Sequence, residues 1–102
     1  MKKTLLVLTC VTGAVFANYA MAAGDAAAGK EKSSACVGCH GMNGKSSNPQ
    51  YPNLAGQKGP YLEKAIKAYK TGERKDAMMS TFASALSDQD IADLAAFYSS
   101  IK

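Results

Sequence analysis

The pattern of apolar and polar positions predicts three helical segments, which follow an apolar start to the chain. In residues 59–72, Leu62, Ile66 and Tyr69 recur at the spacing of one helix face. Pro60 suits the first turn of this helix, because a proline lacks the N–H group that would be unpaired there. We therefore expect a helix here, with one face packed against the rest of the domain.

The C-terminal segment, residues 86–102, carries the strongest helix signal. Ser87 can cap its start, and Asp90 follows at the spacing of a capping box. An apolar stripe at helical period then continues to the end of the chain and consists of Ile91, Leu94, Ala95, Tyr98 and Ile101.

The remaining helical segment, residues 23–40, comes first in the chain and is rich in alanine. Asp25 can serve as its N-cap. Gly29 lies inside this segment, although glycine lowers helix stability by roughly 1 kcal/mol relative to alanine. We infer that another element approaches the backbone closely at Gly29.

Two loops are expected between the three helices. Residues 41–58 are dominated by Gly, Asn, Ser and Pro, and residues 72–85 are irregular and include Met78 and Met79. No segment has the pattern of a strand, so the predicted fold is all-α. Loops of this length in a small domain usually carry function.

The first 22 residues have the features of a secretory signal peptide. Lys2 and Lys3 precede a mostly apolar run, and Ala20 and Ala22 place small residues at a cleavage site. We expect cleavage after Ala22, which leaves residues 23–102 as one domain in the periplasm. An uncleaved anchor is the alternative, but the interrupted run barely reaches the ~20 apolar residues of a membrane span.

Composition shows that the predicted mature domain is small and weakly charged. The chain has 12 basic and 8 acidic side chains, and loss of Lys2 and Lys3 leaves a formal charge of +2. This charge is too small and scattered to indicate nucleic-acid binding. Because a domain of 80 residues without tryptophan buries a modest core, we expect a cofactor or another staple.

The stretch SSACVGCHGMNGKSS, residues 33–47, is the most informative about chemistry. Cys36 and Cys39 stand three positions apart, and His40, the only histidine, follows directly. The third cysteine, Cys10, lies in the predicted signal peptide. The spacing C-x-x-C-H is the attachment motif of c-type haem.

Two other chemistries use the same residue types. A thiol–disulfide centre usually follows a strand in an α/β fold, and none is predicted here. Structural zinc requires four ligands, whereas the mature domain supplies two Cys and one His. Covalent haem fits better, because two thiols on one helical turn can each add to a vinyl group while His40 reaches the iron.

The iron of a c-type haem usually takes a second axial ligand from further along the chain. With no other histidine present, methionine is expected. Met42 is too close to His40 to reach the opposite haem face. Met78 and Met79 therefore both remain candidates.

With these motifs the mature chain resembles a class I cytochrome c. It is similar to the small periplasmic monohaem group, to single domains of the dihaem cytochromes c4, and to the c5 and c553 types. The resemblance rests on CVGCHG, YPNLAGQ, YLEKAIKAYKTGERKDAMM and LSDQDIADLAAFYSS. It implies an all-α cytochrome c fold, with three main helices and loops wrapped around one covalently bound haem c. The chain departs from cytochromes c4 in having one such domain instead of two.

The resemblance also implies roles for single residues near the haem. The carbonyl of Pro52 would accept a hydrogen bond from the other ring nitrogen of His40. Leu54 would pack on the porphyrin, and Gly56 would form a tight turn beside it.

Two further implications concern the axial ligand and the helix packing. The distance to the LSD signature selects Met79 rather than Met78 as the iron ligand. The family also crosses its first and last helices at a glycine, which here corresponds to Gly29 packed against Leu94, Phe97 and Tyr98.

The function implied is that of an electron carrier, not an enzyme, which passes single electrons between periplasmic proteins. Expected partners are membrane oxidase or reductase complexes and other cytochromes, with no nucleic acid and no small-molecule substrate. A monomer or weak dimer is expected. An acidic partner could be steered by Lys45, Lys58, Lys64, Lys67, Lys70, Arg74 and Lys75. The alternative is a haem enzyme or sensor with a labile methionine ligand.

Overall fold

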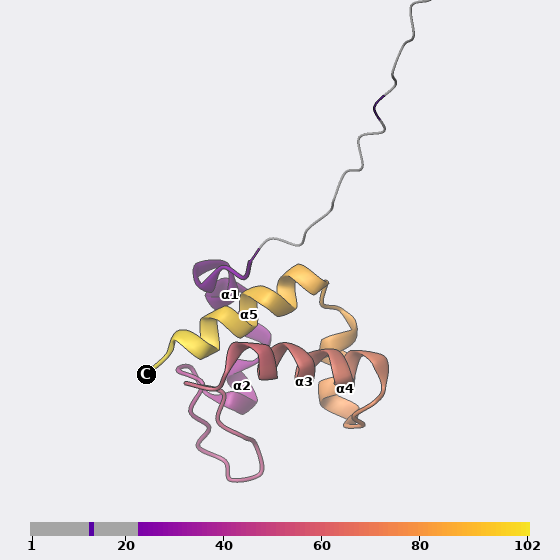
Figure 1. Ribbon diagram of the computed structural model, residues 1–102. Coiled ribbons are helices and arrows are strands. Elements are labelled where there is room, and N and C mark those ends of the chain that lie inside the picture. Colours follow the sequence, from indigo (N-terminus) through magenta and orange to yellow (C-terminus); the bar gives the residue numbers. More distant parts are fainter. Residues whose placement is uncertain (1–12, 14–22) are drawn as a thin grey trace, which may run out of the picture.

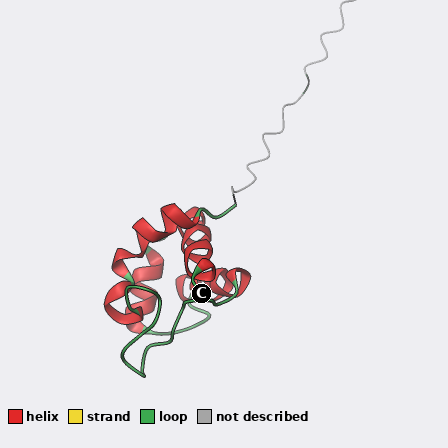
Figure 2. Cartoon of the chain, turned by 90° about the vertical axis from the view of Figure 1, so that its left-hand side faces the viewer, coloured by secondary structure: helices red, strands yellow, loops and turns green. Residues whose placement is uncertain are grey.

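The computed structural model describes Gly13 and residues 23–102, so most of the predicted signal peptide lies outside the described residues. The described part contains helices and loops and no strand, which confirms the all-α prediction (Figure 2). In order, its elements are α1 (Ala26–Lys32), the 3-10 turn η1 (Ser33–Ala35), α2 (Val37–His40), α3 (Gly59–Thr71), α4 (Ala77–Ser84) and α5 (Asp88–Ser100). Helix α5 packs against both α1 and α3, and α4 packs against α3 (Figure 1). None of these helices combines the length and apolarity that a membrane span requires.

The crossing of α1 and α5 depends on a glycine. A Cβ atom at Gly29 would overlap the backbone carbonyl of Asp93 and crowd the Cβ of Phe97. This confirms the close approach predicted at Gly29 and its packing against Phe97. The nearest atoms belong to Asp93 and Phe97, however, and not to Leu94 or Tyr98.

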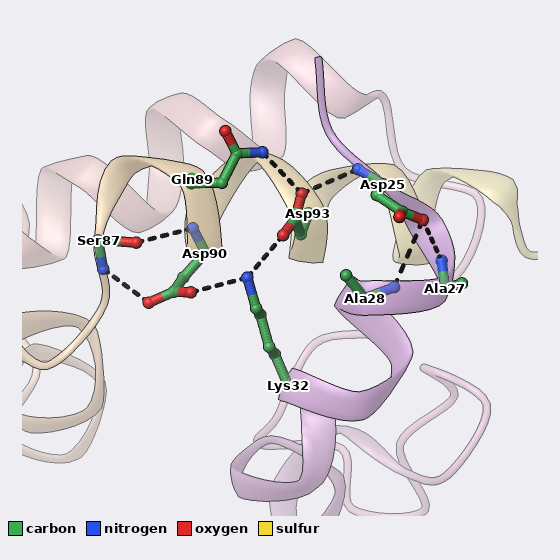
Figure 3. Close-up of polar contacts among 8 residues, drawn as sticks. All are labelled: Asp25, Ala27, Ala28, Lys32, Ser87, Gln89, Asp90 and Asp93. Carbon is green, nitrogen blue, oxygen red and sulfur yellow. Dashed lines mark hydrogen bonds and ion pairs between the residues drawn. The ribbon is translucent and has the colours of Figure 1, made fainter. Parts of the chain in front are cut away.

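A polar cluster joins the same two helices; we call it the crossing cluster (Figure 3). The Nζ atom of Lys32 lies 2.8 Å from Asp90 Oδ1 and 2.6 Å from Asp93 Oδ2. The other oxygen of Asp93 accepts hydrogen bonds of 2.9 Å from the Asp25 backbone N–H and from Gln89 Nε2. Because Lys32 bonds to both carboxylates, it is the main cause that lowers the pKa of Asp90 and of Asp93 to about 2.

The helix ends follow the predicted signals. The carboxylate of Asp25 accepts from the backbone N–H groups of Ala27 and Ala28 at the start of α1. Ser87 and Asp90 form the complete capping box at the start of α5. Gly72 ends α3 with a left-handed φ of 86°, which a residue without a side chain adopts at low cost.

The helical segment predicted over residues 23–40 is divided into three short elements in the structure. The chain tightens into a 3-10 turn at Ser33–Ala35 and resumes as the short helix α2. The Ser33 hydroxyl donates to the Lys30 carbonyl at 2.6 Å, and Cys36 N–H bonds to the Ser33 carbonyl at 2.8 Å. A serine side chain that competes for a backbone carbonyl disfavours continuation of the regular helix.

The prediction of an irregular loop over residues 72–85 is wrong, because α4 lies within it. Asp76 caps this helix, and its Oδ1 accepts from the Met79 backbone N–H at 2.9 Å. The segment has no long apolar stripe and contains several poor helix formers, so its local cap was its main sequence signal. Met78 and Met79 consequently lie in the first turn of a helix and not in a loop.

The hydrophobic core is small, as the composition predicts. Its central cluster of buried side chains consists of Leu62, Leu94, Ala95 and Tyr98. The side chains packed against this core are only partly buried within the polypeptide and comprise Cys36, Leu54, Ile66, Leu86, Phe97 and Ile101. The cluster therefore brings apolar side chains from α3, from α5, from the 41–58 loop and from the turn before α5 together with Cys36.

Candidate haem site

The two cysteines of the motif lie on one turn of chain. Backbone bonds from Cys39 and His40 to the Cys36 carbonyl, at 3.3 and 2.9 Å, fix this turn. Both thiols are free and both cysteines are partly buried. The turn therefore presents two cysteine side chains in fixed order, with His40 immediately after them.

His40 is oriented by the loop that follows it. Its side chain is buried, with 6 % of its surface exposed, and Nδ1 lies 2.8 Å from the Pro52 carbonyl oxygen. Since a carbonyl can only accept, Nδ1 must carry the hydrogen of this bond. The Nε2 atom of the neutral ring is then left with a lone pair that a metal ion can use. This is the contact between Pro52 and His40 that the resemblance implies.

The loop of residues 41–58 is closed at its base by Gly44, a residue that the sequence reasoning missed. The Gly44 carbonyl accepts from Leu54 N–H at 2.7 Å and from Ala55 N–H at 3.0 Å. Gly44 has a left-handed φ of 69°, and a Cβ there would lie 2.8 Å from the Ala55 nitrogen. A single glycine in a Gly-rich loop gives no specific sequence signal, so its role emerges only from the folded contacts.

Leu54 and Gly56 connect this loop to α5. Leu54 is partly buried against the core, and Gly56 forms a turn with a left-handed φ of 71°. The Gly56 N–H donates to the Tyr98 carbonyl at 2.9 Å. The loop is thereby attached both to His40 through Pro52 and to the C-terminal helix through Gly56.

The two candidate methionines differ in exposure although they are adjacent. Met78 is 60 % exposed, whereas Met79 is partly buried. The backbone N–H of Met79 is held by the Asp76 carboxylate, which fixes this residue at the start of α4.

The hydroxyl of Tyr98, near the Cys36 thiol, is a buried polar group without a hydrogen-bond partner among the described residues. Burial raises the pKa of the Cys36 thiol, and contact with the Tyr98 hydroxyl partly opposes this rise. Burial also raises the pKa of Tyr98, so its hydroxyl keeps its proton.

These features fit a covalently bound haem. Two free thiols on one turn provide the attachment points, and the neutral imidazole of His40 provides an iron ligand. Partly buried apolar side chains surround them, as a porphyrin requires. No group of three His, Cys, Asp or Glu residues in the described part of the chain is placed to hold a metal ion, so zinc has no matching donor set there.

Comparison with known proteins decides between these chemistries. Residues 26–102 match the family model described as "Cytochrome c". The chain belongs to the cytochrome c family. As a cytochrome c it binds haem c through Cys36, Cys39 and His40, and it is an electron carrier.

Two named relatives are similar to this cytochrome c over most or all of its length. It is 57 % identical over 81 residues to cytochrome c-554(548) of Halomonas halodenitrificans, covering 76 % of this chain and 98 % of that protein. It is 44 % identical over 102 residues to cytochrome c4 of Pseudomonas aeruginosa, covering 100 % of this chain and 50 % of that protein.

A solved structure gives the same result for the fold. The structure of reduced recombinant cytochrome c4 from Pseudomonas stutzeri superposes with a TM-score of 0.75 at 43 % identity, and the match covers 78 % of this chain and 47 % of that chain. The chain thus spans about half the length of the cytochromes c4 that it matches. The resemblance to a single domain of cytochrome c4 is confirmed.

Proposed function

We propose that this cytochrome c carries single electrons between periplasmic proteins, with its iron held between His40 Nε2 and Met79 Sδ. Haem c, when bound, supplies iron that alternates between Fe(III) and Fe(II). The observation that carries the proposal is the 2.8 Å contact between His40 Nδ1 and Pro52, which selects the tautomer with Nε2 free. The partial burial of Met79, beside an exposed Met78, supports the choice of the second ligand.

The polypeptide contributes mainly by holding its ligands still. The Pro52 carbonyl fixes the plane of the His40 ring and makes the ring a stronger donor. On the other ligand, the Asp76 carboxylate fixes the backbone of Met79 at the start of α4, away in the sequence from the loop that orients His40. A soft thioether ligand favours Fe(II), so the reduction potential should exceed that of a site with two histidines.

The apolar residues around the motif have a complementary role. Leu54, Ile66 and Leu86 are partly buried against the core and would cover the porphyrin, which excludes water from it. A dry site with both ligands fixed favours electron transfer over binding of a small molecule. Such a site favours an electron carrier over a haem enzyme or sensor with a labile methionine.

Replacement of each methionine tests the ligand assignment. Met79→Ala should abolish the Met-to-iron charge-transfer band of the ferric protein and lower the potential. Met78→Ala is the matched control, because it removes the same side chain one position away and should leave the band intact. Loss of the band in Met78→Ala alone would reassign the ligand and overturn this part of the proposal.

The partners are proposed to be redox proteins with an acidic docking surface. The basic groups do not form one uniform patch, since Lys64 and Lys67 share a groove on α3 with Glu63 and Glu73. Lys70 is engaged by the Leu86 carbonyl, and Arg74 lies 4.6 Å from the centre of the Tyr69 ring. Steering should therefore be moderate, and the rate of electron exchange should fall moderately with ionic strength.

The identity of the partner can be approached through the relatives. One relative, 39 % identical, is named "Thiosulfate dehydrogenase electron acceptor" in Thiomonas intermedia, and the match covers 45 % of that protein. Stopped-flow mixing of the reduced cytochrome with purified oxidases, and of the oxidised form with dehydrogenases, would identify acceptor and donor. Failure of every such protein to exchange electrons faster than small-molecule mediators would contradict the carrier role.

Export is the remaining part of the proposal. If residues 1–22 form a signal peptide, the periplasmic holoprotein should begin at Ala23. N-terminal sequencing of the purified protein tests this directly. A protein that begins at Met1 and sediments with membranes would support the anchor instead.

A further inference from the structure

A buried hydroxyl of α5 has no assigned role in the site described above. Tyr98 is 2 % exposed, and its oxygen has no hydrogen-bond partner among the described residues. A buried hydroxyl without a partner destabilises a fold, whereas phenylalanine would fill the same space without that cost. A tyrosine at this position is therefore favourable only if its hydroxyl has a hydrogen-bond partner, and the described residues provide none in this structure.

The immediate surroundings of this hydroxyl contain two polar side chains. They are the Cys36 thiol and the Ser33 hydroxyl, and Cys36 packs against the same core cluster as Tyr98. Ser33 already donates its hydrogen to the Lys30 carbonyl at 2.6 Å. Tyr98 and Cys36 thus belong to one packed cluster, and the hydroxyl and the thiol are close enough for each to influence the pKa of the other.

The ring of Tyr98 is held in place on several sides. Its backbone carbonyl accepts from Gly56 N–H at 2.9 Å, and its ring centre lies 4.9 Å from that of Phe97. A Cβ atom on Gly44 would lie only 2.9 Å from its Cδ1 atom, so this side is also in close contact. The hydroxyl cannot move away to another partner without disturbing these contacts.

Haem attachment changes what the sulfur can do. A thiol can donate or accept a hydrogen bond, but a thioether sulfur has no hydrogen and can only accept. We propose that Tyr98 is a positioning residue for the haem: its hydroxyl donates a hydrogen bond to the Cys36 thioether sulfur and fixes the orientation of that bond. This proposal depends on attachment at Cys36 and not on which methionine binds the iron.

Substitution of Tyr98 in the holoprotein tests whether its hydroxyl stabilises or destabilises the fold. If the hydroxyl donates to the sulfur, Tyr98→Phe should raise the unfolding equilibrium constant of the ferric holoprotein by about three- to tenfold. Tyr61→Phe, at an exposed tyrosine of α3, is the matched control and should leave the constant unchanged. If Tyr98→Phe is as stable as the parent or more stable, the hydroxyl is unpaired and the proposal fails.

Two further measurements identify the partner. The loss of stability caused by Tyr98→Phe should persist in a Ser33→Ala background. It should disappear in a Cys36→Ala holoprotein, in which the haem is attached through Cys39 alone. Loss of the cost in the Ser33→Ala background would show that the serine is the partner and would overturn the proposal. A cost that survives Cys36→Ala would overturn it as well.

Vibrational spectroscopy gives a readout that a purely structural role would not change. In resonance Raman spectra of the holoprotein, the thioether C–S stretching band should shift in Tyr98→Phe and remain in place in Tyr61→Phe. An unshifted band in Tyr98→Phe would contradict the hydrogen bond even if stability changes. The charge-transfer band reports on Met79 separately, so failure of the axial assignment and failure of the Tyr98 contact give different results.

Discussion

The region where α1 crosses α5 differs sharply from the region around the two methionines. At the crossing, a glycine permits close backbone contact and Asp93, 3 % exposed, accepts bonds from three different residues. Around the methionines, one carboxylate caps α4, Met78 is 60 % exposed and Phe82 is 42 % exposed. The crossing depends on contacts within the polypeptide, whereas the methionine region leaves apolar side chains exposed on the surface of the polypeptide.

The largest effect should come from removal of the haem attachment. The double substitution of Cys36 and Cys39 by alanine should leave no haem-containing protein, because a domain with so small a core depends on its cofactor. Absorbance and haem staining of the periplasmic fraction would measure this. Ser34→Ala, an exposed change in the 3-10 turn just before Cys36, is the control and should keep normal haem content. Covalently bound haem in the double variant would contradict the attachment chemistry.

The next largest effect should come from filling the space at the crossing. Gly29→Ala should destabilise the holoprotein by about 3 kcal/mol or more, because the new Cβ would overlap the Asp93 backbone. Gly38→Ala is a matched control in α2, where nothing lies within 4 Å of an added Cβ. Denaturant unfolding measures both, and equal stabilities would refute the close packing.

A smaller effect is expected from the charges of the crossing cluster. The pKa values of Asp90 and Asp93 are lowered from 3.8 to about 2, so their ionised forms stabilise the fold above pH 3.8. That stabilisation is lost as the pH falls toward 2. Asp93→Asn should lower stability at neutral pH and make the decline between pH 4 and pH 2 shallower.

Acid titration of the unfolding free energy tests this prediction. The matched control is Asp88→Asn, because Asp88 is exposed and lies in the same first turn of α5 as Asp90. It should leave the acid profile unchanged. A profile for Asp93→Asn that parallels the parent would show that the cluster does not contribute through its charge.

The smallest effect should separate the two regions most cleanly. Asp76→Ala removes the cap that holds the Met79 N–H and should weaken the restraint on Met79 by about 1 kcal/mol. Because added imidazole must displace Met79 from the ferric iron, its affinity should rise roughly fivefold. Asp25→Ala removes the equivalent cap of α1 and should not change imidazole affinity. Spectral titration with imidazole compares them, and equal affinities would mean that the cap does not restrain Met79.

Much of this fold could be predicted because its signals are local. The caps and stripes of α3 and α5 lie within single segments, and the C-x-x-C-H motif is contiguous. The pattern predicts a loop around the methionines because α4 has a short, weakly patterned sequence and depends on one cap. Local patterns thus identified the elements that carry their own stabilising contacts.

What the sequence could not reveal depends on distant partners. The burial of Asp93 is explained by Lys32, which is 61 positions earlier in the chain. The contact between Pro52 and His40 depends on the loop base that the Gly44 carbonyl holds together. The burial of the Tyr98 hydroxyl depends on the turn around Cys36. Neither spacing nor periodicity reports such contacts, because each joins segments whose proximity exists only after folding.

The hydrogen-bonded base of the 41–58 loop separates the support of His40 from the outer residues of that loop. Beyond Gly44, Ser46 and Asn48 bond to each other, and Asn48 also receives the Gln50 N–H. The chain there is mostly exposed, and its ends are already fixed. The outer loop is therefore an insertion point, where a peptide tag or an electrode-binding sequence can be grafted at small entropic cost while the axial histidine keeps its geometry.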